Sequence, residues 1–230
     1  MKKYKKNENL SYCAGAYPSF ELLNKKANIV KEVFYDPDFN EIEKLKKICN
    51  ENFIRITESK KTVKRLSLRK NDYVIVVFEK YETKLENANH IILENIENMG
   101  NLGTIMRSMA AFGYRNLALI GNTCDYFNPK VVRASMGSIF DINIEKFEDI
   151  SKYTKVFSNE IYAFMLDNEA CGLKKVDKKK NFSLAFGNEG YGLTDDFKKF
   201  NTVMIEQTDL VDSLSIQIAA AVSMYEFKEF

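Results

Sequence analysis

The 230-residue chain has little metal-binding chemistry. It contains a single histidine, His90, and four cysteines that lie far apart, at positions 13, 49, 124 and 171, without a C-x-x-C pair. A zinc site, or any other metal, is therefore not expected. Widely spaced thiols suit a reducing compartment, so we expect a cytoplasmic protein. His90 opens an apolar run, where a histidine is more often structural than catalytic.

Long apolar runs are also absent. No segment approaches the roughly 20 apolar residues needed to cross a bilayer. The basic start MKKYKKNENLSY has no apolar region behind it, unlike a signal peptide. We therefore expect no membrane association. Hydrophobic residues still make up 45% of the chain, which is enough for a core, and the length fits one large domain or two small ones.

The net charge of +2 conceals an asymmetry. Residues 1–84 carry 19 Lys and Arg against 12 Asp and Glu, a net charge of +7, whereas residues 85–230 carry 15 against 20, a net charge of −5. This distribution favours an anionic partner that contacts the N-terminal part of the chain. Solvated lysine-rich surfaces would explain the charge alone equally well.

Helix-like and strand-like segments alternate in two blocks separated by a polar linker at 82–89. In the first block, apolar periodicity predicts helices at 18–27, 39–52 and 59–68 and strands at 28–35, 53–57 and 72–81. The second block has predicted strands at 90–95, 116–121, 142–147, 161–166, 182–187 and 202–206. Its predicted helices lie at 102–113, 128–137, 149–157 and 194–200 and from about Asp212. We expect domains at 1–84 and 85–230, with a parallel α/β sheet that binds ligands outside the carboxyl ends of its strands.

Three junctions in the second block are candidates for a site: ENMGNLGTIMRS (97–108), GNEGYGLT (187–194) and TDLVDSLSIQIAAA (208–221). The glycines of the second junction run G-x-x-G-x-G, the reverse of the dinucleotide-binding spacing, which argues against an oxidoreductase. No G-K-[ST] follows, so a P-loop is excluded. A carboxylate at Glu189 would repel a pyrophosphate. The loop instead suits a ligand with positive character or with hydroxyl and amino groups, or it is a tight turn with a solvent-facing Glu.

Taken together and in order, four segments resemble the SpoU (TrmH) family of RNA ribose 2′-O-methyltransferases, part of the SPOUT superfamily. They are Asn101-x-Gly103-x-x-x-Arg107, NPKVVRASMGSIF, GNEGYGL and DSLSIQIAAAVSMYEF. The resemblance covers about residues 88–230 and implies an α/β domain with a deep C-terminal trefoil knot. The first 85 or so residues are similar, less specifically, to the substrate-binding domain of many members, whose fold is like that of ribosomal protein L30e.

The resemblance further implies a cofactor, S-adenosylmethionine, and a homodimer in which RNA at one protomer's cofactor meets residues of the other. The implied cofactor-binding residues are Gly187, Asn188, Glu189, Gly190, Ile205 and Leu214. The implied catalytic residues are Asn101, Arg107, Glu189, Ser213 and Ser215.

Several roles stay open at these positions. Arg107 could stabilise the developing alkoxide or act as the base, and we favour electrostatics because a guanidinium remains protonated. Asn101 could orient Arg107 or cap its helix, and Ser213 could cap the last helix. We expect Gly187 to allow close approach of the cofactor and Glu189 to accept a hydrogen bond from the cofactor or Arg107.

The chain departs from the family pattern twice. Asn98-Met99 replaces Asp-Pro in the first motif, and Ser213-Leu214-Ser215 replaces Ser-Leu-Asn in the third. These departures leave open a non-catalytic RNA-binding protein that keeps the knot. Ribosomal RNA is favoured over tRNA as the substrate because of the N-terminal domain. The expected phosphate contacts are Lys60, Lys61, Lys64, Arg65, Arg69, Lys70 and Arg133.

Overall fold

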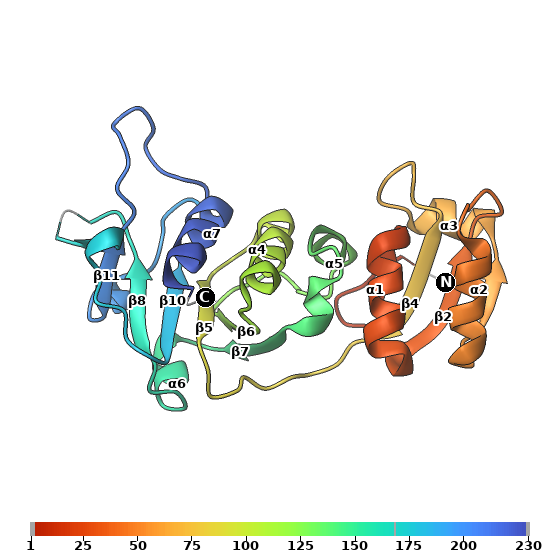
Figure 1. Ribbon diagram of the computed structural model, residues 1–230, viewed down its shortest axis with the longest axis horizontal. Helices are drawn as coiled ribbons and strands as arrows, with labels where there is room; N and C mark the ends of the chain where they lie inside the picture. The colour runs from red at the N-terminus through yellow and green to blue at the C-terminus, as the bar shows by residue number, and fades with distance from the viewer. Residues whose placement is uncertain (1–2, 168, 229–230) are drawn as a thin grey trace. The chain divides into compact units, whose positions relative to one another are not determined.

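The computed structural model describes residues 3–167 and 169–228 (Figure 1). The chain divides into two compact units. The first consists of the residues up to Tyr81 together with Asp125–Asp141, and the second of Glu82–Cys124 with the residues from Ile142 onward. Residues 80–89 form neither helix nor strand, as expected from the polar sequence at 82–89.

The first unit contains a four-stranded sheet in the order β1-β4-β2-β3. Its strands are β1 (Leu10–Ala14), β2 (Val30–Tyr35), β3 (Ile56–Glu58) and β4 (Val74–Glu79), and its helices include α1 (Ala16–Lys26), α2 (Ile42–Glu51) and α3 (Lys60–Leu66), with the 3-10 turn η1 (Ala27–Ile29). The predicted helices and strands of this region are confirmed, with shifted ends. The sequence did not predict β1. Both β1 and β2 pair antiparallel with β4, so the sheet is mixed.

Helix α5 (Pro129–Ala134) and the 3-10 turn η2 (Ser138–Asp141) belong to the first unit, although strands of the second unit precede and follow them. Asn128 caps α5 by accepting a hydrogen bond from Lys130 N, and Pro129 occupies its first position. Ser11 Oγ, buried in β1, donates to Phe127 O over 2.5 Å. The first unit therefore includes a segment that the sequence boundary at 84/85 assigned to the second domain.

The second unit contains a seven-stranded sheet in the order β7-β6-β5-β10-β8-β11-β9, and every pair of neighbouring strands is parallel, as predicted. Its strands are β5 (His90–Glu94), β6 (Asn116–Ile120), β7 (Asn143–Phe147), β8 (Glu160–Phe164), β9 (Cys171–Gly172), β10 (Phe182–Phe186) and β11 (Asn201–Met204). Its helices and turns are α4 (Met99–Phe112), α6 (Ile150–Thr154), η3 (Leu173–Lys175), η4 (Asp195–Phe197) and α7 (Ile216–Phe227). No helix in residues 3–167 and 169–228 is long and apolar enough to cross a bilayer.

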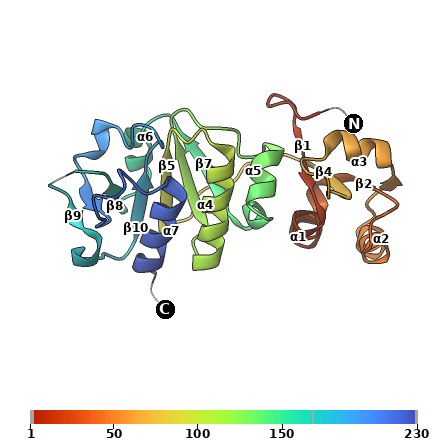
Figure 2. The same cartoon turned by 90° about the horizontal axis from the view of Figure 1, so that it is seen from above.

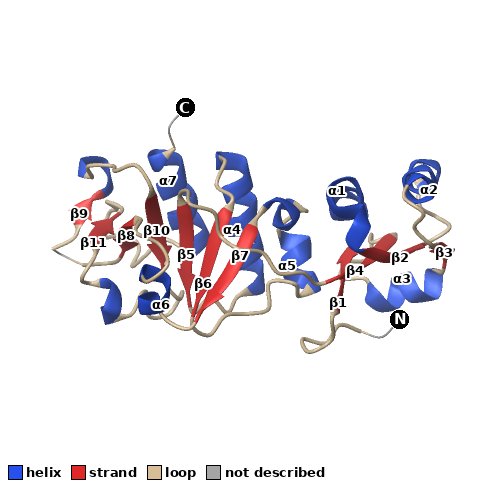
Figure 3. Ribbon diagram, turned by 90° about the horizontal axis from the view of Figure 1, so that it is seen from below, coloured by secondary structure: helices blue, strands red, loops and turns tan. Residues whose placement is uncertain are grey.

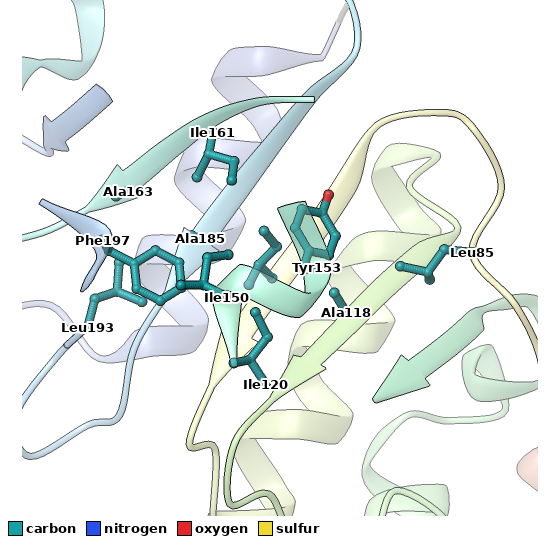
Figure 4. Packing of buried hydrophobic residues seen from close by; sticks show 11 residues of the cluster. Leu85, Ala118, Ile120, Ile150, Tyr153, Ile161, Ala163, Ala185, Leu193 and Phe197 are labelled. Atoms are coloured by element: carbon teal, nitrogen blue, oxygen red, sulfur yellow. The ribbon is translucent and has the colours of Figure 1, made fainter. Parts of the chain in front are cut away.

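Helices cover both faces of this sheet. Figures 2 and 3 show α4 and α7 next to each other on one face and α6 on the other. On the α6 face, Ile150 and Tyr153 join strand residues in a buried cluster that also contains Leu193 and Phe197 (Figure 4). Burial of a Leu or Phe side chain contributes about 1.5–3 kcal/mol. These two residues therefore fix the chain just after the GNEGYG loop to the core.

The last helix begins later than predicted, at Ile216 rather than near Asp212. Residues 205–215 form no regular helix or strand, and the Gln207 side chain donates to Asp212 O at 3.1 Å. Leu210, just before the predicted start, is 90% exposed. The loop is therefore an irregular segment that brings Ser213 and its neighbours to the sheet edge.

His90 is structural, as expected. It is fully buried at the start of β5, with Nδ1 2.7 Å from Tyr153 Oη and Nε2 2.7 Å from Glu86 O. The Tyr153 hydroxyl also lies 2.7 Å from Ser183 Oγ. Burial lowers the pKa of His90, so the neutral ring, with Nε2 donating to the carbonyl, satisfies the network.

Candidate functional site

A cavity of about 680 Å³ lies where strands β8, β10 and β11 end and helix α7 begins. Ligand sites in parallel sheets are expected at this edge. The cavity is lined by the ends of these strands, by the GNEGYG loop and by the segment that precedes α7: Phe164, Met165, Leu166, Phe186, Gly187, Asn188, Glu189, Gly190, Tyr191, Gly192, Leu193, Val203, Ile205, Gln207, Ser213, Leu214, Ser215, Ile216 and Ala219.

The GNEGYG loop is a tight hairpin closed by its own backbone. Asn188 and Gly192 exchange two hydrogen bonds, of 3.0 and 2.9 Å. A Cβ atom on Gly187 would lie 2.0 Å from the carbonyl carbon of Gly192, and Gly192 has a φ of +73°. Only glycine fits either position without moving backbone. The Cβ side of Gly187 therefore faces the returning hairpin, and close approach of a cofactor to its backbone stays a prediction.

Asparagine and threonine side chains tie this hairpin to the neighbouring strand ends. Asn188 Nδ2 donates to Asn95 O at 3.0 Å, just after β5, and Asn95 Oδ1 accepts from Asn122 N at 2.8 Å, just after β6. Thr194 donates from N and from Oγ1 to the buried carboxylate of Glu94, at 2.8 and 2.9 Å. The loops after three adjacent strands are thus joined into one rigid rim.

Glu189 has a defined partner in the second unit. Its Oε1 accepts a hydrogen bond from Asn101 Nδ2 at 2.6 Å, which links the hairpin to the first turn of α4. The proposed capping role of Asn101 is therefore wrong, and in the single chain its side chain bonds to Glu189 rather than to Arg107. The cap is Asn98, whose Oδ1 accepts from Gly100 N and Asn101 N. Within the single chain Glu189 is bonded to Asn101, so its pairing with the cofactor or with Arg107 stays a prediction.

The third motif supplies the remaining wall. Ser213, Leu214 and Ser215 line the cavity beside Ile205. The N-cap of α7 is Ser215 rather than Ser213, and its side chain makes no capping hydrogen bond. Helix capping therefore does not account for Ser213. Both hydroxyls lie at the cavity, where each offers a donor and acceptors to a ligand.

Arg107 lies outside the cavity. It follows Asn101 by six helical residues, which places it about 9 Å further along the axis and about 120° around it. Its side chain is exposed and has no hydrogen-bond or ion-pair partner among the residues that the structure describes. Within one chain, the six cofactor candidates, Glu189 among them, line one cavity together with Ser213 and Ser215. Asn101 is linked to this cavity through its hydrogen bond to Glu189, and Arg107 does not line it.

Lining residues that the sequence did not predict include four at two places. Phe164 ends β8, Met165 and Leu166 follow it, and Tyr191 lies in the hairpin. The rule that ligands bind at the carboxyl ends of strands could have found the first three, because β8 is a predicted strand. No group of three His, Cys, Asp or Glu side chains in the described parts of the chain could hold a metal ion.

A second cavity, of about 610 Å³, lies in the first unit between α3 and the loop that leads to β4. Four of the expected phosphate contacts line it: Lys60, Lys64, Arg69 and Lys70. Lys60 bonds to Asp38 at 2.6 Å and lies 3.6 Å from Asp36. That hydrogen bond raises the pKa of Lys60 and lowers the pKa of Asp38.

The third carboxylate of this cavity, Asp72, is also satisfied. Its Oδ2 accepts from Leu68 N and Arg69 N, and its Oδ1 pairs with Arg133, which also donates to Ala14 O at 3.0 Å. Arg133 is thus a structural partner of the loop and not the free phosphate contact expected from the sequence. Lys64, Arg69 and Lys70 have no side-chain partner among the described residues. Lys61 and Arg65, equally without a partner, do not line the cavity.

The fold is α/β, and its cavity lies at the carboxyl edge of a parallel sheet, where ligands bind in folds of this class. The model of the SpoU rRNA Methylase family matches residues 88–225. Because this match takes in more than half of the sequence, the chain belongs to the SpoU rRNA Methylase family.

Two kinds of relative place the chain within this family. The 23S rRNA (guanosine(2553)-2′-O)-methyltransferase RlmP of Bacillus subtilis is 29% identical over 160 residues, which cover 64% of this chain and 61% of that protein. The AdoMet-bound rRNA methyltransferase of Sinorhizobium meliloti superposes with a TM-score of 0.80 at 25% identity, over 95% of this chain and 87% of that one. A structure reported for the 2-OH methylation of C/U34 on tRNA has a TM-score of 0.56 at 26% identity, and it covers 60% of this chain and 93% of its own.

Proposed function

We propose that the protein transfers a methyl group from S-adenosylmethionine to a ribose 2′-hydroxyl of ribosomal RNA. The observation that carries the proposal is the convergence of the second and third motifs on one cavity, with the first motif attached through the Asn101–Glu189 hydrogen bond. The names of the relatives support the same reaction. The tRNA-related structure covers 60% of this chain, whereas the rRNA methyltransferase of Sinorhizobium meliloti covers 95% of it, which favours ribosomal RNA over the alternative, tRNA.

The residues of the cavity fit the cofactor. Its volume lies in the range of about 300–1,000 Å³ that is usual for ligand sites. Glu189 offers an anion to a sulfonium cation or acceptors to amino and hydroxyl groups, and the backbone around Ile205 and Leu214 belongs to no helix or strand. Gly187, Asn188 and Gly190 would act through the hairpin that they shape. Bound S-adenosylmethionine supplies an electrophilic methyl group that needs only in-line placement of the hydroxyl.

The chain's own residues would prepare the hydroxyl. Arg107 carries a permanent positive charge that stabilises a developing alkoxide and holds the adjacent phosphate. Ser213 and Ser215 would hold the ribose or the cofactor by hydrogen bonds, while Asn101 fixes Glu189. The dependence of the methyl-transfer rate on pH, compared between Arg107→Lys and the wild type, tests whether Arg107 also accepts the proton. A base role requires that the substitution shifts this pH profile, whereas an electrostatic role does not.

The direct test is methyl transfer from labelled S-adenosylmethionine to ribosomal RNA from a strain lacking the gene. We expect incorporation at a ribose, and none with Arg107→Ala, whose cofactor binding by calorimetry should stay near that of the wild type. Cofactor binding without transfer to ribosomal RNA or tRNA would instead support a non-catalytic RNA-binding protein. Mapping 2′-O-methylation in that strain identifies the nucleotide.

A homodimer would complete the site. Ile218, Val222 and Tyr225 are exposed at 49, 40 and 57% and recur along one face of α7, so an apolar stripe faces solvent in the single chain. We propose that a second copy covers this stripe. Val222→Asp should then convert a dimer into a monomer in light scattering, and Val156→Asp, the same change at a more exposed valine of the second unit, should not.

The dimer gives Arg107 a route to a cavity. Arg107 of one copy could serve the cavity of the other. In that case a mixed dimer of Arg107→Ala and Ser213→Ala has one intact site out of two. Because about half of the dimers in an equal mixture are mixed, we expect about a quarter of the wild-type activity. No recovery in a mixture shown to exchange subunits would place Arg107 at its own cavity. The trefoil knot, the L30e-like character of the first unit, its contact with RNA and a cytoplasmic location belong to the same proposal.

A further inference from the structure

Tyr191 differs from the other aromatic residues of the cavity in the second unit. Phe164 and Phe186 stack on each other, with ring centroids 4.8 Å apart and an interplanar angle of 16°. Tyr191 lines the same cavity but is 64% exposed. Its side chain makes no hydrogen bond or ring contact with any residue that the structure describes. One ring is therefore left available at the rim.

The hairpin fixes the backbone that carries this ring. Asn188 and Gly192 close the loop on either side, and Gly190 N donates to Asn188 Oδ1 at 2.8 Å. Glu189 is fixed to Asn101 of α4. An isolated exposed tyrosine is ordinary. A tyrosine on a loop tied at each neighbouring residue is preorganised, which lowers the entropy cost of contact with a ligand.

We propose that Tyr191 is a stacking platform for a nucleobase of the RNA substrate, at or beside the nucleotide whose ribose enters the cavity. The inference rests on the proposed function. RNA-binding proteins recognise unpaired nucleotides largely by stacking bases on aromatic side chains. The adenine of a cofactor is the weaker candidate, because ligands inside such cavities lose about 70–90% of their exposed surface. The inner wall at Phe186, Ile205 and Leu214 suits that ligand better than the exposed rim.

The absence of tryptophan from the chain allows a direct test. Tyr191→Trp introduces a single tryptophan, whose fluorescence should be quenched saturably by single-stranded oligouridylate. An abasic ribose-phosphate oligomer of the same length should not quench it. Val156→Trp is the matched control, because Val156 is 65% exposed in the same unit and does not line the cavity. Equal quenching in both variants, or quenching by the abasic oligomer, overturns the proposal. Quenching by S-adenosylhomocysteine alone assigns the ring to the cofactor and also overturns it.

Kinetics with ribosomal RNA give an independent readout. Tyr191→Ala should raise KM for RNA by about 5-fold to about 150-fold, the range expected for one stacked base. The kcat and the cofactor Kd should stay near wild type, and Tyr191→Phe should retain the wild-type KM. An unchanged KM in Tyr191→Ala refutes the platform. If the wild-type protein transfers no methyl group while base-specific quenching is seen, the proposed function fails and the platform stands.

Discussion

Three cations in the first unit should account for most of its salt-dependent RNA binding. Lys64, Arg69 and Lys70 line one cavity, and the carboxylates of that cavity are already satisfied by Lys60, Arg133 and backbone N–H groups. A phosphate that enters the cavity therefore meets three cations that have no ion-pair partner among the described residues. Changing each of the three to glutamine removes these charges without a change in the backbone.

The magnitude follows from counterion release. Each phosphate contact contributes about 0.7–0.9 to the slope of log K against log salt concentration. Between about 50 and about 200 mM salt, one contact weakens binding about threefold and three contacts weaken it about thirtyfold. The triple variant should therefore lose about two units of slope, and binding at low salt should fall accordingly. Filter binding of labelled ribosomal RNA over a salt series measures both.

The matched control is Lys61→Gln with Arg65→Gln. Lys61 and Arg65 lie on α3, as Lys64 does. They are exposed and carry the same charge as the three test residues, but they do not line the cavity. We expect each of these two substitutions to change the slope of log K against log salt concentration by less than half as much as each substitution at the cavity. Equal changes per charge at all five positions would show that RNA senses only the overall field of the helix, and the assignment of the cavity would be wrong.

Three further predictions concern the second unit. Asn101→Asp should lower the rate of methyl transfer more than tenfold, because it replaces the amide that donates to Glu189 by a second carboxylate that repels it. Asn101→Gln keeps the amide and should lower the rate less. Single-turnover rates measure both effects. Gly187→Ala should destabilise the protein by about 1–3 kcal/mol or more in urea unfolding, whereas Gly190→Ala, whose Cβ would meet only Asn188 Oδ1 at 3.3 Å, should change little. Burial lowers the pKa of His90, so stability should be complete above the unfolded-state pKa of about 6.5 and fall below it by at most about 1.4 kcal/mol per pH unit. Urea unfolding between about pH 5 and about pH 7 tests this, and His90→Asn should abolish that slope, since the chain has no other histidine.

Local sequence was sufficient where an element carries its own signals. Strands β5, β6 and β10 each consist mostly of apolar residues and are buried along their whole length, as the apolar runs of the sequence predict. Strand β1 was missed because Ser11 and Tyr12 give it a mixed character, and Ser11 is satisfied only by Phe127 O, 116 residues away. The start of α7 was placed near Asp212, whereas the residues up to Ser215 are irregular and Gln207 Nε2 donates to Asp212 O at 3.1 Å. The bond between Ser11 and Phe127 is a contact that a local window cannot contain.

The site follows the same division. Motif order placed Gly187, Ile205 and Leu214 at one sheet edge, and the structure lines one cavity with all three. The partner of Glu189 could not be read from the sequence, because Asn101 lies 88 positions earlier and Arg107 was an equally acceptable partner. Arg133 was misassigned for a related reason. Its charge resembled a phosphate contact until Asp72, 61 positions earlier, was found to neutralise it.

The two departures from the family pattern have different consequences. Asn98 and Met99 occupy the N-cap and first position of α4, where Asp and Pro serve the same local purpose. Because Asn98 Oδ1 already accepts two backbone hydrogen bonds, this departure changes the start of a helix and no group at the cavity. Ser215 is different, since it lines the cavity and its hydroxyl is not used in capping. Ser215→Asn therefore tests whether Ser215 has cost the protein its activity. If the shorter serine side chain limits methyl transfer, the longer amide of Ser215→Asn should raise the rate of transfer, which would support an RNA-binding protein that has lost turnover. An unchanged or lower rate would show that Ser215 does not limit the site.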